Sequence, residues 1–420
     1  MNVRRRVTVP GYGWSSPIVS GEKVFVTTAI CGHQQAPARN GPGGGEEAPD
    51  VVYRWEVYCL DRATGKTLWK QVAAQHKPRA GNHISNTYAS ETPVTDGQHV
   101  YAYFGMVGVF CYDLAGKLVW SRDLGAYRTF ANWGSSSSPA LEGSRLFMLC
   151  DNEQQSFLVA LDTKTGNELW RVERDERSTW STPILWRNKL RTELVVMGSN
   201  FNRAYDPATG KELWRCATER SLGNRQAGPS GSGAPKGKSK GDRAASGGCK
   251  ASPVAGDEML YLGMSSKTPG QELGPMWAIK AGAAGDISLR PGEKSNSGVA
   301  WFRNDAGPHF TSALVLEGRL YAFPAHDRGV LNCFDAKTGA TIYQEPLPGA
   351  AGFKASPCAY DGDILATDEA GTTFIVAAGP AFKLLAGNRL DEMTWSSPAL
   401  VGDAIILRTV SSVCCIGQSQ

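Results

Sequence analysis

The chain has 420 residues, of which 41% are hydrophobic and 20% charged, with 48 glycines and 12 tryptophans. This composition describes a folded protein rich in turns and argues against intrinsic disorder. The net charge of +4, from 44 basic and 40 acidic residues, and the lack of a basic stripe among aromatic residues argue against a nucleic-acid partner. No apolar run reaches the roughly 18 residues that a membrane-spanning helix needs.

The chain opens with Arg4, Arg5 and Arg6, a charge pattern that also starts secretory signal peptides. No hydrophobic segment of about 7 to 15 residues follows them, so this chain shows no signal peptide. Residues 3–9 instead have the character of a strand, and the chain begins inside a repeat.

A short signature then recurs eight times, with Ser or Thr before Pro in seven copies and before Ala in the other, and a short apolar segment after it. The copies are Ser16-Pro17, Thr92-Pro93, Ser138-Pro139, Thr182-Pro183, Ser252-Pro253, Ser312-Ala313, Ser356-Pro357 and Ser397-Pro398. Pro93 and Pro139 are 46 residues apart, and Pro357 and Pro398 are 41 apart. Such a period is typical of one propeller blade.

A second signature, a strand followed by Asp-x-x-Thr-Gly and a strand that ends in Leu-Trp, is complete at residues 158–170. Asp bonds forward to the turn backbone, Thr does so more weakly, and Gly adopts a positive φ, so each copy predicts a tight hairpin between antiparallel strands. The aromatic column at the end of the outer strand is interpreted as structural docking against the neighbouring blade. Its members are Trp69, Trp120, Trp170, Trp214, Trp301, Tyr343 and, as a further variant, Leu385.

Three blades carry insertions, at residues 31–54, 223–248 and 281–297, which we interpret as surface loops. The last repeat stops before a Leu-Trp strand. Trp170 lies ten residues before Trp180, and counting ten back from Trp14 reaches Arg4, so residues 3–9 are predicted to complete the last blade. The sequence therefore predicts an all-β fold, a single eight-bladed β-propeller of four-stranded antiparallel blades over residues 1–420.

A column of small residues precedes the hairpins and is predicted to pack where neighbouring sheets approach closely. It consists of Cys59, Cys111, Ala160, Ala204, Ala278, Cys333, Ala377 and Cys415. Its cysteines are expected to be free thiols, because equivalent positions in different blades lie too far apart to bridge.

A third set precedes the Ser/Thr-Pro signature, where the chain enters the innermost strand of each blade. It consists of Trp14, Tyr88, Trp133, Trp180, Lys250, Phe310, Lys354 and Trp395. In a propeller these side chains lie near the central channel, so they are the candidate binding residues. The alternative is plain packing at the channel entrance.

The unit at residues 160–170, Ala-Leu-Asp-x-x-Thr-Gly-x-x-Leu-Trp, resembles the tryptophan-docking repeat of quinoprotein alcohol dehydrogenases. The non-enzymatic propeller lipoprotein of bacterial outer-membrane assembly has the same repeat, and residues 90–97, 179–183 and 390–395 look like uncharacterised bacterial envelope proteins that carry it. This resemblance to the pyrroloquinoline-quinone-like propeller family covers essentially the whole chain, and it implies fold more than activity. It also implies a periplasmic or envelope location.

The resemblance leaves open a dehydrogenase that uses pyrroloquinoline quinone and calcium, in which adjacent cysteines form a ring against the quinone. Cys414 and Cys415 are adjacent, but neighbouring side chains of a strand point to opposite faces. Residues 151–153, Asp-Asn-Glu, are the best metal candidate, although calcium needs about six to eight oxygen ligands. The histidines lack metal-ligand spacing, and no catalytic residue or metal ligand is assigned.

These observations predict a non-catalytic binding or scaffold protein without a cofactor, in which variable loops on a rigid fold recognise a partner. The expected partner is a protein, a peptide or a carbohydrate. The protein is expected to be a monomer. The alternative is the quinone-dependent dehydrogenase.

Overall fold

The computed structural model describes residues 2–32, 34–39, 44–218, 249–268, 271–324 and 329–417. Its strands form eight antiparallel blades, which give the chain the fold of an eight-bladed all-β propeller with almost no helix. Contacts divide the chain into two compact units: residues Met1–Glu173, Gly349–Ala378 and Lys383–Gln420 form the first, and residues Arg174–Pro348 and Gly379–Phe382 form the second. That residues 1–420 fold as one domain stays a prediction.

The first unit contains five four-stranded blades. Three of them are β2 (Ile18–Ser20), β3 (Lys23–Ile30), β4 (Tyr53–Asp61) and β5 (Thr67–His76); β6 (Val94–Thr95), β7 (His99–Phe104), β8 (Gly108–Asp113) and β9 (Leu118–Arg122); and β10 (Ala140–Glu142), β11 (Arg145–Cys150), β12 (Ser156–Asp162) and β13 (Glu168–Arg174). The other two are β29 (Cys358–Tyr360), β30 (Asp363–Thr367), β31 (Thr372–Ala377) and β32 (Leu384–Arg389); and β33 (Ala399–Val401), β34 (Ala404–Arg408), β35 (Ser412–Gly417) and β1 (Asn2–Thr8). The short 3-10 helix η1 is Phe130–Asn132.

The second unit contains three blades. They are β14 (Ile184–Arg187), β15 (Thr192–Val196), β16 (Phe201–Tyr205), β17 (Glu212–Ala217) and β23 (Gly285–Asp286); β18 (Val254–Ala255), β19 (Met259–Gly263), β22 (Met276–Lys280) and β24 (Val299–Arg303); and β25 (Leu314–Leu316), β26 (Arg319–Ala322), β27 (Val330–Asp335) and β28 (Thr341–Pro346). A hairpin, β20 (Ser266–Thr268) and β21 (Gln271–Leu273), separates β19 from β22. Among the segments described, no helix has the length and apolar character needed to cross a membrane.

The insertions differ from one another. The described part of residues 31–52 contains no strand. The insertion at 223–248 lies outside the described residues. The prediction of a plain surface loop at 281–297 needs correction, because β23 adds a fifth, parallel strand beside β17 and Ile287 and Leu289 are buried in the same apolar cluster as Trp214. Because Ile287 and Leu289 are apolar, this part of the insertion packs against the blade and is not exposed to solvent.

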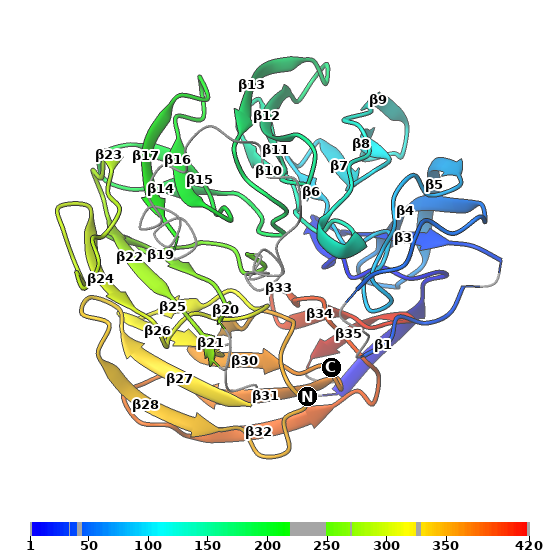
Figure 1. Cartoon of the computed structure of the whole chain (residues 1–420). Helices are drawn as coiled ribbons and strands as arrows, with labels where there is room; N and C mark the ends of the chain where they lie inside the picture. Colours follow the sequence, from blue (N-terminus) through cyan, green and yellow to red (C-terminus); the bar gives the residue numbers. More distant parts are fainter. Residues whose placement is uncertain are drawn as a thin grey trace. The chain divides into compact units, whose positions relative to one another are not determined.

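The N-terminal strand completes the last blade, as predicted. β1 pairs antiparallel with β35, and Figure 1 shows this blue strand beside the red one. Its register shifts at Arg4, so that Arg5 lies opposite Cys415. Other outer strands have the same register shift at the residue before the docking tryptophan, as at Leu68 before Trp69 and at Val119 before Trp120. Arg5 therefore occupies the position of the docking tryptophan.

The Ser/Thr before each proline forms a hydrogen-bonded belt between blades, a role that the sequence does not reveal. Its backbone N–H donates to the side-chain hydroxyl of the equivalent residue in the next blade, at 2.9–3.0 Å. In the first unit the order is Ser356, Ser397, Ser16, Thr92 and Ser138, and in the second it is Thr182, Ser252 and Ser312. Proline keeps the preceding residue extended, which suits this pairing.

The docking geometry repeats between several neighbouring blades. The indole Nε1 of Trp69 donates to Leu114 O at 3.1 Å, and that of Trp120 donates to Thr163 O at 2.9 Å. Both acceptors follow the turn aspartate of the next blade. The two rings cover Gly116 and Gly166, where a Cβ would lie within 2.8 Å of the indole carbons. Glycine is needed there for space as well as for its positive φ. Trp301 makes the same contact with Ala336 O at 3.0 Å.

The remaining members of the column vary. Trp214 donates to Glu193 in its own blade, at 2.6 Å, because the following blade has no Asp-x-x-Thr-Gly turn. Trp170 packs 5.8 Å from Phe147, and Tyr343 packs edge-on against Phe382. Arg5 donates from Nη1 to Arg62 O, the acceptor equivalent to Leu114 O, at 3.2 Å.

In the blade β29–β32, the alignment made from the sequence is wrong by two residues in β31 and by one residue in β32. Ile375, and not Ala377, pairs with Leu365 in the small-residue column, and Ala386 lies opposite Ile375 in the docking column. Leu385 falls at the register shift. This blade has neither the turn motif nor the tryptophan that align the others.

Candidate recognition site

The strands of each blade alternate in direction, so the second-to-third-strand hairpins and the linkers between blades lie at one end of the sheets. The Asp-x-x-Thr-Gly turns lie at the other end. The predicted entrance residues belong to the linkers, and their surroundings differ from one blade to the next.

The entrance residues of three blades in the first unit form a stack. Trp14 and Trp395 lie 5.2 Å apart with an interplanar angle of 18°, and the Lys354 ammonium lies 5.1 Å from the Trp395 ring centroid. Trp14 is buried, and its indole Nε1 donates to Ser85 O at 2.9 Å. This arrangement is that of packed side chains and favours the structural alternative for Trp14.

In the second unit, Lys250 lies over the Phe310 ring at 4.8 Å, and its Nζ is 2.9 Å from Nε2 of His309. Trp180 is buried, and its backbone N–H donates to Cys249 O at 2.7 Å. These residues occupy equivalent positions three residues before Pro183, Pro253 and Ala313.

Tyr88 and Trp133 do not belong to this column. The hydroxyl belt places Thr92 and Ser138 in register with Ser16, so the residues equivalent to Trp14 are Ser90 and Ser136. Tyr88 packs instead on Tyr53, with centroids 5.0 Å apart. The sequence alignment selected the aromatic residue nearest to each of these two Ser/Thr-Pro pairs, although Tyr88 and Trp133 are not at the same distance from their pairs as Trp14 is from Ser16-Pro17.

Trp133 lies in a surface built from three segments of the first unit, residues 44–47, 81–86 and 129–134, which we call the loop platform. Backbone hydrogen bonds join the segments: Glu46 and Asn82 exchange two, at 2.8 and 3.2 Å, and Gly45 N–H donates to Ala131 O at 2.7 Å. The Asn132 side chain donates to Glu47 Oε1 at 3.0 Å. The insertion at 31–54 is thereby tied to the linkers of two neighbouring blades.

The loop platform is locally strained. Ala131 and Asn132 both have positive φ, at 49° and 56°, and no other two consecutive non-glycine residues do so in the described ranges. The Asn82 side-chain oxygen beneath them is buried without a hydrogen-bond partner. Such costs persist where the surrounding structure imposes them, often at functional sites. The turn presents two half-buried aromatic rings, Phe130 and Trp133, edge-to-face at 5.5 Å.

A buried carboxyl lies in the linker that follows residues 81–86. Glu91 is 2% exposed, and burial raises its pKa to about 7 against the opposing hydrogen bond from Ser135 Oγ to Oε1 at 2.6 Å. The equivalent residue of the neighbouring blade is Ser15, so the sequence has a glutamate where a small hydroxyl fits.

We expect Glu91 to make stability depend on pH. Its folded pKa lies above the unfolded value, so its full contribution is present below about pH 4.5 and is lost as the pH rises through about 7. Relative to the wild type, Glu91→Gln should gain about 2 kcal/mol in unfolding free energy between pH 5 and pH 8. Denaturant unfolding at the two pH values measures this gain. Glu345→Gln, an exposed control, should gain nothing, and an equal gain in the control would contradict the assignment.

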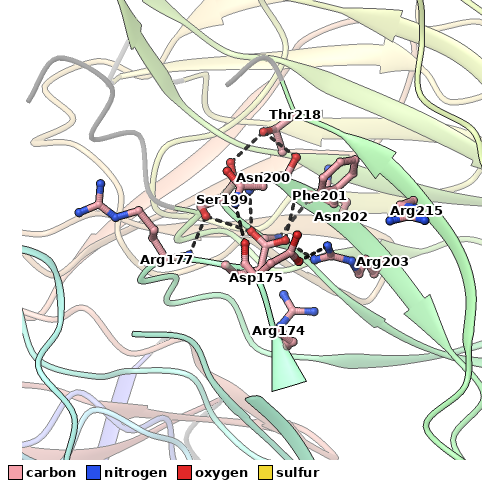
Figure 2. A network of polar contacts seen from close by, with 12 residues as sticks. Arg174, Asp175, Arg177, Ser199, Asn200, Phe201, Asn202, Arg203, Arg215 and Thr218 are labelled. Carbon is pink, nitrogen blue, oxygen red and sulfur yellow. Dashed lines mark hydrogen bonds and ion pairs between the residues drawn. The ribbon is translucent and has the colours of Figure 1, made fainter. Parts of the chain in front are cut away.

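A second polar cluster ties the linker at residues 174–177 to the hairpin between β15 and β16, and Figure 2 shows it from close by. The Arg203 guanidinium contacts Glu176 and also Asp175. The Glu176 carboxylate further accepts Asn200 N–H at 2.6 Å and Phe201 N–H at 3.1 Å. These contacts hold the linker at residues 174–177 against the hairpin of the same unit, which gives the cluster a structural role.

The candidate residues for a quinone and calcium are not arranged as those groups require. Cys414 pairs with Leu407 and Cys415 with Ile406 in a regular strand, which directs the two thiols to opposite faces. The Asn152 side chain is used within its own turn, where its oxygen accepts the N–H groups of Gln154 and Gln155 at 2.8 and 2.7 Å. Among the described residues, no three His, Cys, Asp or Glu side chains gather as metal ligands.

The fold and its repeat are similar to those of the pyrroloquinoline-quinone-like β-propellers. Within that class, residues 54–227 match the family described as outer membrane protein assembly factor BamB. No curated protein matches the sequence.

Solved structures agree on the fold. The crystal structure of BamB from Moraxella catarrhalis has 11% identity and a TM-score of 0.57, with 99% of each chain covered. The computationally designed Ika8 protein has 10% identity and a TM-score of 0.53, covering 90% of this chain and 98% of its own. Quinohemoprotein alcohol dehydrogenase from Comamonas testosteroni has 11% identity over 98% of this chain and 76% of its own, but its TM-score of 0.42 is too low to support an argument.

Proposed function

We propose that this protein is a non-catalytic β-propeller of the cell envelope that uses no cofactor and recognises a protein partner through the loop platform. The observation that carries the proposal is the convergence of three loop segments on a strained turn that presents Phe130 and Trp133. A loop held rigidly by a propeller scaffold suits recognition. Aromatic residues are enriched in the centres of protein interfaces.

The match to an outer membrane assembly factor supports an envelope location and a protein partner. The tryptophan docking contacts and the hydroxyl belt support the scaffold part, because they hold neighbouring blades rigidly in register. Peptides and carbohydrates also bind aromatic surfaces, so they are alternative outcomes of the test.

Site-specific photo-crosslinking in cells tests the proposal. Benzoylphenylalanine placed at Phe130 should capture one discrete envelope protein, and Trp133→Ala should abolish the adduct. The same group at Leu190, a 63% exposed side chain of the second unit, is the control and should give no such adduct. If the adduct is absent at Phe130, or is identical at both positions, the platform is not the recognition site.

The dehydrogenase alternative is tested with purified protein, pyrroloquinoline quinone and calcium. No saturable change in the quinone absorbance and no dye-linked oxidation of alcohols are expected. Saturable binding with turnover would replace the proposal with the enzyme. A glycan array tests the carbohydrate alternative in the same way.

A further inference from the structure

We infer that the first unit binds a small carboxylate on the guanidinium of Arg408, where the blade that contains β33–β35 meets the blade β2–β5. Arg408 is the last residue of β34, and its Nη1 donates to Ser15 Oγ at 2.7 Å and to Thr27 O. Both acceptors belong to the blade β2–β5 or to the linker that enters it. The inference goes beyond the proposed function and does not depend on the loop platform.

Arg408 is a buried charge without a counter-ion. It is 2% exposed, and burial lowers its pKa to about 9, so the guanidinium stays protonated at neutral pH. Among the described residues, no acidic side chain forms an ion pair with it or raises this pKa. A buried charge is costly unless an opposite charge and hydrogen bonds compensate it. The two acceptors of Nη1 supply only part of that compensation.

The unpaired part of the guanidinium is the edge formed by Nε and Nη2. Neither nitrogen donates to a described residue, and unlike the Nε of Arg62 neither is fully enclosed, so both keep some accessible surface. The two parallel N–H bonds of this edge match the two oxygens of a carboxylate. A monovalent carboxylate neutralises the single charge, whereas a phosphate dianion would leave a buried negative charge. Because Arg408 is almost fully buried, the ligand must be small, of the size of formate or acetate.

The position of Arg408 is uncharged in every other blade. The equivalent residues, which lie in or directly after the second strand of each blade, are Thr27, Tyr103, Leu149, Met197, Gly263, Phe323 and Thr367. The fold therefore requires no cation at this position, and an apolar side chain of similar volume would avoid the cost of burying a charge. An arginine at one of eight equivalent positions indicates a local role that packing does not explain.

The linker that enters the blade β2–β5 leaves room for the guanidinium. A Cβ at Gly13 would lie 2.7 Å from Arg408 Nη2 and 2.7 Å from Thr27 O, and Gly13 has no positive φ, so glycine is needed there for space. Acceptors are scarce beside this linker, because the Nε1 of Trp395, whose ring stacks on Trp14, is also buried without a hydrogen-bond partner. A carboxylate would supply the acceptor that the Nε and Nη2 edge of Arg408 lacks.

NMR of the full chain labelled with ¹⁵N-arginine tests the inference, because the Nε–H of a buried arginine gives a resolved resonance. Arg408→Lys, which keeps the charge and loses the fork, identifies the Arg408 resonance. Titration with formate should shift this resonance in a saturable way, and chloride at the same ionic strength should not. The melting temperature of the wild type should rise with formate over the same concentration range, because a ligand that binds only the folded state stabilises it.

Two substitutions separate anion binding from a purely structural role of the arginine. Arg408→Met should abolish the dependence of the melting temperature on formate, and Arg408→Lys should weaken formate binding at least tenfold. Arg389→Met, which replaces an exposed arginine of β32, is the control and should keep the full dependence. Equal shifts with formate and chloride, no shift with either, or a dependence that Arg408→Met retains would overturn the inference. The two titrations of the wild type decide the question even if Arg408→Met does not fold.

Discussion

Replacing Trp120 with alanine should lower the free energy of unfolding by about 3 to 5 kcal/mol. The side chain is 8% exposed, covers Gly166 of the next blade and donates to Thr163 O. Alanine removes both the buried ring and the hydrogen bond, and the two sheets cannot close over the space because their backbones are held by the hydroxyl belt. Guanidinium unfolding followed by circular dichroism measures the loss.

Leu118 is the matched control because it lies in the same strand, β9, and is 48% exposed. Leu118→Ala should change stability by less than about 0.5 kcal/mol. Trp120→Phe should fall between the two, since it keeps a ring and loses the indole N–H. Equal stabilities for Trp120→Ala and Leu118→Ala would contradict the docking role.

Replacing Glu176 with glutamine should cost about 3 kcal/mol of unfolding free energy. The side chains of Glu176 and Arg203 are 0% and 4% exposed, so the substitution leaves a buried guanidinium without its buried counter-ion. Glutamine has nearly the same volume, so the loss measures charge more than packing. Thermal and denaturant unfolding report it.

Asp175 contacts the same guanidinium but is 71% exposed, which makes it the control for a solvated ion pair. Asp175→Asn should cost less than about 1 kcal/mol. Glu176→Gln combined with Arg203→Met should recover part of the stability of Glu176→Gln, because no buried charge is left unpaired. If Glu176→Gln is no more harmful than Asp175→Asn, the cluster contributes little to the fold.

Local sequence patterns predicted the blades well because the turns and strands of each blade depend on residues that are close together in the chain. The Ser/Thr-Pro and Asp-x-x-Thr-Gly signatures predicted the eight blades, and the missing Leu-Trp strand predicted the pairing of β1 with β35. The blade β29–β32, which lacks both the turn motif and the tryptophan, was misaligned. Where the motif disappears, composition alone does not define register.

The candidate site was predicted much less well. Trp14, Lys354 and Trp395 do meet, but as a packed stack. Trp133 was selected for a column of entrance residues to which it does not belong. Its half-buried position results from another feature, the turn at Ala131 and Asn132. The only signal available in the sequence was the insertion at 31–54, which identifies neither the linkers that it contacts nor the strain that results.

The sequence by itself determined the number of blades and the turn that joins the outer strands, because these depend on residues close together in the chain. It also determined the pairing of the terminal strands, because the last repeat lacks the strand that the N-terminal segment supplies. Only the tertiary structure decided that Arg5 takes the place of a tryptophan, that serine and threonine hydroxyls link neighbouring blades, and that three loops form one platform. These contacts join residues dozens to hundreds of positions apart, and their geometry exists only once the sheets have packed.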